Sequence, residues 1–378
     1  MRSNYKRLGD FIKEVKARNK VLDSKKLLGI NIDKFFMPSV ANVIGTDMSV
    51  YKIVKKYQFA CNRMHVGRDY RLPISMSISD EDFMVSPAYD VFEIIDTNVL
   101  YPEYLMMWFT RREFDRNAWF YTDADVRGGL HWKALCDMQL PIPSIAKQKE
   151  IVREYNVIQN RIALNKQLIQ KLEDTAQAIY KQWFVNENFE TGMVKLCEYV
   201  KTNPQLSIKK NSIATYVEMN DLTTTSMRIS DSIKREFIGG SKFQNYDTLL
   251  ARITPCLENG KTAFVDILEE EEIAAGSTEF IVMRAKKNIS PYWIYCLARD
   301  EHFRSYAISS MVGSSGRERV HEKYLDDFIL PEIKIDNMND FHLKVKPIFK
   351  MVHIKSTEVK NLEALRELLL SKLATIEN

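Results

Sequence analysis

The sequence of this chain contains one pattern twice. Residues 131–141 read HWKALCDMQLP, and residues 321–331 read HEKYLDDFILP, so that the two copies are offset by 190 in the numbering. Further upstream, Arg63 pairs with Arg252 at an offset of 189. A repeat of this length constrains the fold strongly, because each copy is one structural unit and both are expected to adopt the same architecture.

Length and composition agree with two or three units. The chain has 378 residues, which exceeds the size of one ordinary core. Its charged fraction of 28% and the lack of a long apolar run predict no membrane contact, and the first residues show no secretory signal. The five cysteines are scattered and odd in number, which predicts reduced thiols and a cytoplasmic protein. The net charge of +4 permits a nucleic-acid partner without requiring one.

Each copy consists of a mixed globular part and a long helix. Stretches rich in Val, Ile, Tyr and Phe, such as 83–95 and 278–284, predict strands. The stretches 102–116 and 291–307 predict helices, since each opens with a proline and has apolar residues at helical spacing. The fold class is therefore α/β, of the mixed α+β kind, in two tandem copies.

The two long helices each have a heptad seam. Apolar residues alternate at spacings of four and three from Ile151 onward, and the same spacing returns in the second copy from Phe341 onward. We expect the two helices to form an antiparallel coiled coil with each other; the alternative is that each packs on a separate partner chain. The central seam residues are Ile158, Ile162, Asn165, Ile169 and Leu172, and Ile348, Val352, Lys355, Val359 and Leu362.

Two polar residues occupy equivalent seam positions, Asn165 and Lys355. A polar residue in a seam lowers stability but fixes register. In an antiparallel pair the two would be neighbours, with the Asn165 carbonyl accepting from the Lys355 ammonium. Such a pair relates the globular parts by a pseudo-two-fold. The predicted parts are 1–146 (first globular domain), 147–188 (first coiled-coil helix), 189–336 (second globular domain) and 337–378 (second coiled-coil helix).

The motifs of catalytic sites are incomplete in this sequence. CLENGKT at 256–262 resembles the end of a P-loop, but Pro255 stands where the first glycine is needed, so Asn259-Gly260 is interpreted as a tight turn. No G-x-G-x-x-G is present, and the six histidines lack metal-ligand spacing. His131 and His321 are interpreted as helix caps or as strut residues. We predict no catalytic and no metal-binding residue, and a protein that reads a partner rather than transforms one.

Basic residues cluster in the loops between predicted elements. Arg127 and Arg317 occupy the same position of the two copies, and both lie in a Gly-rich loop. Glycine allows close approach of a phosphate backbone, and arginine reads guanine through two parallel hydrogen bonds. The alternative is a solvated charged loop. The candidate DNA-binding residues are Arg63, Arg68, Arg71 and Arg127 in the first copy, and Arg252, Lys261, Ser314, Ser315, Arg317 and Arg319 in the second.

The chain resembles the specificity subunit of type I restriction-modification systems. The resemblance rests on the order module-helix-module-helix, on LPIPSIAKQKEIV at 140–152 and on RITPCLENGK at 252–261. The second junction, LPEIKIDNMNDFH at 330–342, departs from the pattern because it lacks the Gln-Lys pair.

This resemblance implies a target-recognition domain in each globular part, reading one half of a split, asymmetric site in double-stranded DNA. The coiled coil would set the gap and dock two modification (methyltransferase) subunits, and a restriction (motor-nuclease) subunit would join them. No cofactor is expected in this chain; S-adenosylmethionine, ATP and Mg would belong to those partners. The alternatives are a coiled-coil scaffold that binds only protein, and an enzyme acting on DNA through an unfamiliar site.

Overall fold

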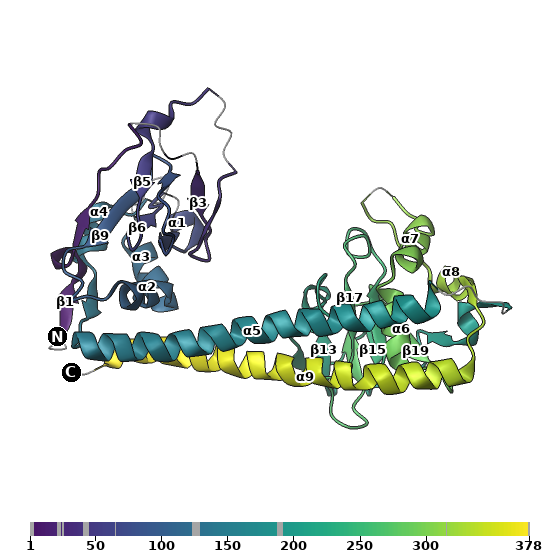
Figure 1. The fold of residues 1–378 in the computed structure, drawn as a ribbon. Helices are drawn as coiled ribbons and strands as arrows, with labels where there is room; N and C mark the ends of the chain where they lie inside the picture. The colour runs from purple at the N-terminus through teal and green to yellow at the C-terminus, as the bar shows by residue number, and fades with distance from the viewer. Residues whose placement is uncertain are drawn as a thin grey trace. The chain divides into compact units, whose positions relative to one another are not determined.

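The computed structural model describes residues 4–20, 24, 26–40, 45–64, 66–122, 129–186, 192–314 and 316–376. These residues divide into two units (Figure 1). Unit 1 comprises residues from 1–161 and 362–378, and unit 2 comprises residues from 162–361. The helices α5 (Ile145–Phe184) and α9 (Ile335–Lys372) each contribute one part to either unit.

Unit 1 has a mixed architecture, in which α2 packs beside strand β7. Phe59 and Phe92 stack in its core with ring centroids 5.1 Å apart, and Phe109 meets Phe59 edge-on. Its elements, apart from α5 and α9, are β1 (Tyr5–Arg7), β2 (Ile12–Glu14), β3 (Leu28–Ile30), β4 (Phe36–Pro38), β5 (Lys52–Val54), β6 (Phe59–Cys61), α1 (Val66–Asp69), β7 (Ile74–Met76), β8 (Phe83–Val85), β9 (Asp90–Ile94), α2 (Pro102–Thr110), α3 (Arg112–Phe120), α4 (Trp132–Asp137) and β10 (Gln139–Pro141).

Unit 2 has helix α6 packed against the sheet of β16, β17 and β19. Seven successive residues of α6 are buried, as expected of a helix that is apolar on all sides. Its elements are β11 (Met193–Lys195), β12 (Val200–Thr202), β13 (Ile213–Val217), β14 (Ile233–Glu236), β15 (Ser241–Phe243), β16 (Thr248–Ala251), β17 (Thr262–Phe264), β18 (Ala274–Gly276), β19 (Phe280–Ala285), α6 (Pro291–Ala298), α7 (Glu301–Ser309), α8 (Glu322–Asp326) and β20 (Ile329–Pro331).

The two units repeat one hydrogen-bonding frame. In each unit a short first strand pairs antiparallel with the strand before the long helix, so that Tyr5 faces Pro141 and Met193 faces Pro331. A four-stranded antiparallel sheet has the same order in both, β2-β9-β6-β7 and β12-β19-β16-β17. The repeat seen in the sequence is therefore a repeat of structure, and the mixed fold class predicted for the two copies is confirmed.

The units differ in what is added to this frame. Unit 2 has a second four-stranded sheet, β14-β13-β18-β15, in which β13 and β18 run parallel. Unit 1 has two separate antiparallel pairs, β3-β4 and β5-β8. The copies thus keep a common core and vary in the segments attached to it.

Both predicted globular helices are in fact two helices. The stretch 102–116 breaks at Arg111, whose backbone is extended between α2 and α3 and whose guanidinium lies 4.2 Å from the centre of the Trp108 ring. The stretch 291–307 breaks at Asp300, whose carboxylate accepts from the backbone N–H groups of His302 and Phe303 at the start of α7. The predicted strand 83–95 is likewise two strands, β8 and β9.

The parts of α5 and α9 that belong to one unit run antiparallel within it. In unit 2, Phe184 near the end of α5 packs on Phe341 near the start of α9, with ring centroids 5.1 Å apart. In unit 1, Arg366 near the end of α9 donates to Gln159 in the first half of α5. All ten predicted seam residues are buried or half-buried. None of the described helices is long and apolar enough to cross a membrane.

The hydrogen bond expected between Asn165 and Lys355 does not form. The Lys355 ammonium lies 2.7 Å from the Glu358 carboxylate on its own helix. Asn165 is buried, and within the described part of the chain its amide nitrogen has no partner. Lys355 thus pairs with Glu358 one turn away on its own helix instead of with Asn165 across the seam. The buried amide of Asn165 keeps a donor without a partner among the described residues.

Replacing Asn165 with leucine is expected to stabilise unit 2 by roughly 1–2 kcal/mol, because it removes an unsatisfied buried donor and adds apolar surface to the seam. Urea unfolding measures the change. Gln167→Leu, at an exposed position of the same helix and the same unit, is the matched control and should give no gain. A loss of stability in Asn165→Leu would contradict the expectation.

Candidate nucleic-acid interface

Two loops of unit 2 lie side by side. One joins β16 to β17 (residues 252–261), and the other joins α7 to α8 (residues 310–321). The Val320 N–H donates to the Arg252 carbonyl at 2.9 Å, and the Thr254 N–H donates to the Glu318 carbonyl at 3.1 Å. The Ile253–Arg319 bridge lies between these bonds. The loops therefore form one surface, and it carries Arg252, Lys261 and the Arg317–Arg319 segment predicted from the sequence.

Arg319 and Arg252 are held by carboxylates. The Arg319 guanidinium donates to both Glu279 oxygens at 2.9–3.0 Å, and this pairing raises the pKa of Arg319 above its ordinary value. Arg252 is mostly buried, with its Nη1 3.9 Å from Glu322. Both arginines therefore hold the two loops in place through these contacts.

Arg317 has a free guanidinium. Its backbone N–H donates to the Ser314 carbonyl at 2.9 Å, closing a turn between Gly313 (φ +143°) and Gly316 (φ +76°). A side chain at Gly313 would meet the Arg317 carbonyl, so glycine is needed there. The Arg317 side chain is exposed and has no partner among the described residues. Ser315 lies outside the described residues.

The turn at Asn259-Gly260 is surrounded by basic side chains. Gly260 has φ +75°, as a tight turn requires, and Lys261 donates to the Met219 carbonyl at 2.9 Å. Arg299 donates to the carbonyls of Gly260 and Thr224, both at 3.0 Å. Arg304 lies so close that a Cβ on Gly260 would be 2.7 Å from its guanidinium. Sequence reasoning missed Arg299 and Arg304, because they come from α6–α7 and reach this turn only in the folded chain.

Arg63, the counterpart of Arg252 in unit 1, is bound inside the fold. Its guanidinium donates to the Asp90 carboxylate in β9 and to the Leu130 carbonyl. The Leu130 N–H donates to the Arg63 carbonyl at 3.0 Å, which repeats the bond between Val320 and Arg252. Arg63 therefore ties β6 to the segment that enters α4.

The other candidates of unit 1 lie at the surface. Arg68 pairs with the neighbouring Asp69 at 2.7 Å, and Arg71 pairs with Asp33 at 2.8 Å. Both side chains are exposed, so water and salt screen these pairs. Arg127 lies outside the described residues. Of the predicted DNA-binding residues described in unit 1, Arg68 and Arg71 are thus exposed and paired with carboxylates, and Arg63 is bound inside the fold.

Exposed aromatic side chains lie near these arginines: Tyr70 stands between Arg68 and Arg71 in the sequence, and residues 119–121 are brought to it by the fold. Tyr70, Trp119, Phe120 and Tyr121 are all exposed, and we call them the aromatic cluster. Tyr70 and Trp119 have ring centroids 5.3 Å apart. The sequence shows three consecutive aromatic residues at 119–121. Their exposure became apparent only because the predicted helix 102–116 is divided into α2 and α3, and α3 ends with Trp119 and Phe120.

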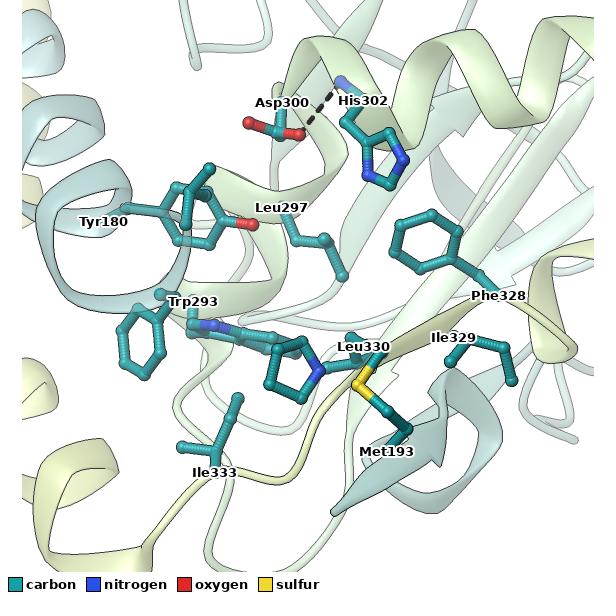
Figure 2. A pocket seen from close by; sticks show the side chains of 13 residues that line it. Tyr180, Met193, Trp293, Leu297, Asp300, His302, Phe328, Ile329, Leu330 and Ile333 are labelled. Atoms are coloured by element: carbon teal, nitrogen blue, oxygen red, sulfur yellow. Dashed lines mark hydrogen bonds between the residues drawn. The ribbon is translucent and has the colours of Figure 1, made fainter. Parts of the chain in front are cut away.

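A separate pocket of about 240 Å³, lined mostly by apolar side chains, lies in unit 2 (Figure 2). Trp293, Leu297 and Leu330 line it, and Asp300 contributes the one carboxylate of the lining. That carboxylate accepts from the backbone N–H of His302 as the cap of α7. His302 also lines the pocket, and its contact with Asp300 is this backbone hydrogen bond at the start of α7.

Other reactive side chains are cysteine thiols and histidines. Burial raises the pKa of the Cys61 and Cys296 thiols well above the ordinary value, so both stay protonated at neutral pH. Among the described residues, no three His, Cys, Asp or Glu side chains are grouped as metal ligands. His321 caps α8, accepting from the Lys323 N–H, as predicted. His131 occupies the same position before α4, but its side chain makes no cap hydrogen bond there, so the predicted cap is wrong for His131.

Comparison with known proteins agrees with these features. The chain is 26% identical over 158 residues to the type I restriction enzyme HindI specificity subunit of Haemophilus influenzae, covering 41% of this chain and 33% of that relative. It is 26% identical over 192 residues to the EcoEI specificity subunit of Escherichia coli, covering 49% of this chain and 30% of the relative. The chain therefore spans about a third of the length of the curated relatives it matches. No family model matches the chain.

A solved structure has the same fold. The type I restriction-modification S subunit from M. genitalium aligns with a TM-score of 0.61 and 11% identity, over 99% of this chain and 96% of that one. The chain thus shares the fold of that S subunit, with two globular parts and two long helices. The resemblance to specificity subunits predicted from the sequence is confirmed by the curated relatives and by this fold.

Proposed function

We propose that this chain is the DNA sequence-specificity subunit of a type I restriction-modification complex, and that it is itself non-catalytic. Each globular part reads one half of a bipartite, asymmetric site. The observation that carries the proposal is a repeated frame with different attachments. The sheets β2-β9-β6-β7 and β12-β19-β16-β17 match strand for strand, whereas the segments mounted on them differ. A common scaffold with different loops suits two readers of different sequences.

The basic residues of unit 2 divide into two roles in this proposal. Arg317 and Arg304 have guanidinium groups with no hydrogen-bonding partner among the described residues, and they remain available for bases or phosphates. Arg252, Lys261 and Arg319 hold the loops that present them. Rigid support matters because a bidentate contact with guanine needs a guanidinium fixed in position.

The long helices carry the proposed partner contacts. Within unit 1, Val157 of α5 and Leu365 and Leu368 of α9 are exposed, and they line a groove of about 470 Å³. Because these apolar residues lie outside the seam, the helix pair exposes an apolar surface of the kind that binds partner proteins. We propose that modification subunits dock on such surfaces, that the helices set the gap between half-sites, and that a restriction subunit completes the complex. S-adenosylmethionine, ATP and Mg would be bound by those partners.

Mapping methylated adenines in the host genome tests the proposal. The expected result is a single bipartite motif that disappears when this gene is deleted and changes when one globular part is exchanged. A protein-only scaffold predicts an unchanged motif after the exchange. An enzyme predicts methyl-donor binding or DNA cleavage by the purified chain alone, and either result would overturn the proposal.

Replacing Arg317 with alanine is expected to relax specificity at one half-site, at a cost of about 1–3 kcal/mol in binding, because its free guanidinium reads a base. Competition gel shifts with substituted duplexes measure the effect in the assembled complex. Lys323→Ala, an exposed lysine one helix further on, is the control and should leave specificity intact. Equal weakening on all sequences would make Arg317 a phosphate contact instead.

A further inference from the structure

The aromatic cluster of unit 1 is an unusual surface for a free protein. Phe120 is 77% exposed and Tyr70 is 62% exposed, while Trp119 and Tyr121 are about half exposed. Phe120 and Tyr121 contact each other edge-on, with ring centroids 5.3 Å apart. Single exposed apolar residues are ordinary, but four neighbouring aromatic rings mark a contact surface.

The rings are presented by a fixed element. Trp119 and Phe120 form the last turn of α3, whose opposite face is anchored in the core by the buried Phe114 and Ala118. The Tyr70 N–H donates to the Val66 carbonyl at 2.9 Å, and its ring packs on Trp119. Helix and loop therefore hold the cluster in place before any partner binds.

The charge around the cluster is positive. Arg112 and Arg116 lie one turn apart on α3, and Arg116 is four residues before Phe120 on the same face. Both guanidinium groups are exposed and have no partner among the residues that the structure describes. The carboxylates of the neighbourhood are already taken by other cations: Asp33 by Arg71, Asp69 by Arg68, Glu113 by Arg111 and Asp115 by Lys34.

The cluster also lies at the position of a candidate DNA loop. Thr122, directly after the cluster, pairs with Leu130, and in unit 2 its counterpart Val312 pairs with Arg319, the residue before the counterpart of Leu130. Between Val312 and Arg319 lies the loop with the free Arg317. The aromatic cluster therefore stands where unit 1 enters the loop that corresponds to the proposed reading loop of unit 2.

We propose that Phe120 is a wedge that inserts between stacked base pairs at the half-site bound by unit 1, with Arg112 and Arg116 on the flanking phosphates. The proposal rests on the proposed function and deepens it. Apolar side chains that enter a base step unstack it and kink the duplex, and arginines beside them neutralise the phosphates brought closer. A protein partner is less suited, because two adjacent unpaired arginines match a polyanion.

The wedge is confined to one half-site. In the alignment of the two copies that equates His131 with His321, Phe120 corresponds to Ser310 in unit 2, and Trp119 corresponds to Ser309. Unit 2 therefore has no aromatic ring at this position. The expected consequence is an asymmetric complex in which an aromatic wedge kinks the DNA at the first half-site only.

The test uses the full chain assembled with its modification subunits and a duplex that carries the mapped site. Single 2-aminopurine substitutions across both half-sites report unstacking as increased fluorescence. Apart from the adenines that the modification subunits flip out for methylation, the wild-type complex should show an increase at one step of one half-site. Phe120→Ala should abolish this signal and weaken binding about tenfold, since stacking of one base on an aromatic ring contributes on that order. Phe120→Tyr, which keeps the ring, should restore both.

Ile78→Ala is the matched control, because Ile78 is 74% exposed in the same unit but follows the end of β7, whereas Tyr70 precedes its start. Ile78→Ala should change neither the 2-aminopurine signal nor the binding affinity. Normal binding and normal 2-aminopurine signals in Phe120→Ala would overturn the wedge while leaving the proposed function intact. Loss of modification-subunit capture without DNA would show a protein-docking patch and overturn it too. Absence of site-specific binding by the wild type would instead refute the proposed function.

Discussion

Replacing Arg63 with alanine is expected to lower the free energy of unfolding of unit 1 by roughly 3 kcal/mol. The Arg63 side chain is mostly buried and is the common donor to the Asp90 carboxylate and the Leu130 carbonyl. Its removal leaves a carboxylate of low exposure and a backbone carbonyl without this donor, and breaking a buried pair on one side costs about 3–5 kcal/mol. The lower end applies, because Arg63 keeps some contact with solvent.

Native-state hydrogen exchange on the amides of β6 and β9 measures this loss in unit 1 separately from unit 2. Arg68→Ala is the control: Arg68 is exposed and pairs only with its neighbour Asp69, so its removal should change stability by less than about 0.5 kcal/mol. If Arg63→Ala left exchange unchanged but removed DNA binding, Arg63 would be a DNA contact, as the sequence alone had suggested.

This contrast shows how far the sequence reaches. The spacing of 189 correctly equated Arg63 with Arg252, because repeated backbone positions keep their offset, and both positions form the same hydrogen bond to the segment before α4 or α8. The side-chain partners of Arg63 and Arg252 could not be predicted from the sequence. Asp90 is 27 residues from Arg63 in sequence, and only the pairing of β6 with β9 brings it near.

The helix breaks limited the prediction of the site. Asp300 was readable as a cap, since an aspartate before EHF offers its carboxylate to the N–H groups of the next turn. Arg111 was not readable, because neither proline nor glycine marks it, and its extended backbone is held by packing on Trp108. Without that break, Trp119 and Phe120 could not be assigned to a second helix with its own exposed face.

Arg299 and Arg304 show the same limit in unit 2. Each lies near position 300 in the sequence, yet each reaches the turn at Gly260 through the packing of α6 on the sheet. Heptads, repeats and turn residues are local or periodic signals, and they were sufficient for the frame and for the long helices. Whether an arginine is free to bind DNA depends on which carboxylates the fold places next to it and on whether other cations already pair with them.

Replacing Lys34 with methionine is expected to have the largest effect, a loss of about 3–5 kcal/mol in unit 1. The Lys34 ammonium lies 2.8 Å from the Asp115 carboxylate, donates to the Phe109 carbonyl and lies 5.2 Å from the centre of the Phe114 ring. Burial lowers the pKa of Lys34, and Asp115 opposes that change. Removing the cation leaves Asp115 as a buried, uncompensated charge, whereas methionine keeps the apolar stem and the Cβ.

The double variant Lys34→Met with Asp115→Asn separates charge from packing. The amide of asparagine can still accept from the Leu72 N–H, which donates to Asp115 at 3.1 Å, and it carries no charge to be neutralised. Most of the lost stability should therefore return in urea unfolding followed by exchange at α3. If the double variant were as unstable as Lys34→Met alone, packing of the lysine stem rather than the ion pair would hold α3. Because α3 presents Phe120, loosening it should also reduce the 2-aminopurine signal in Lys34→Met, and the double variant should recover that signal together with stability.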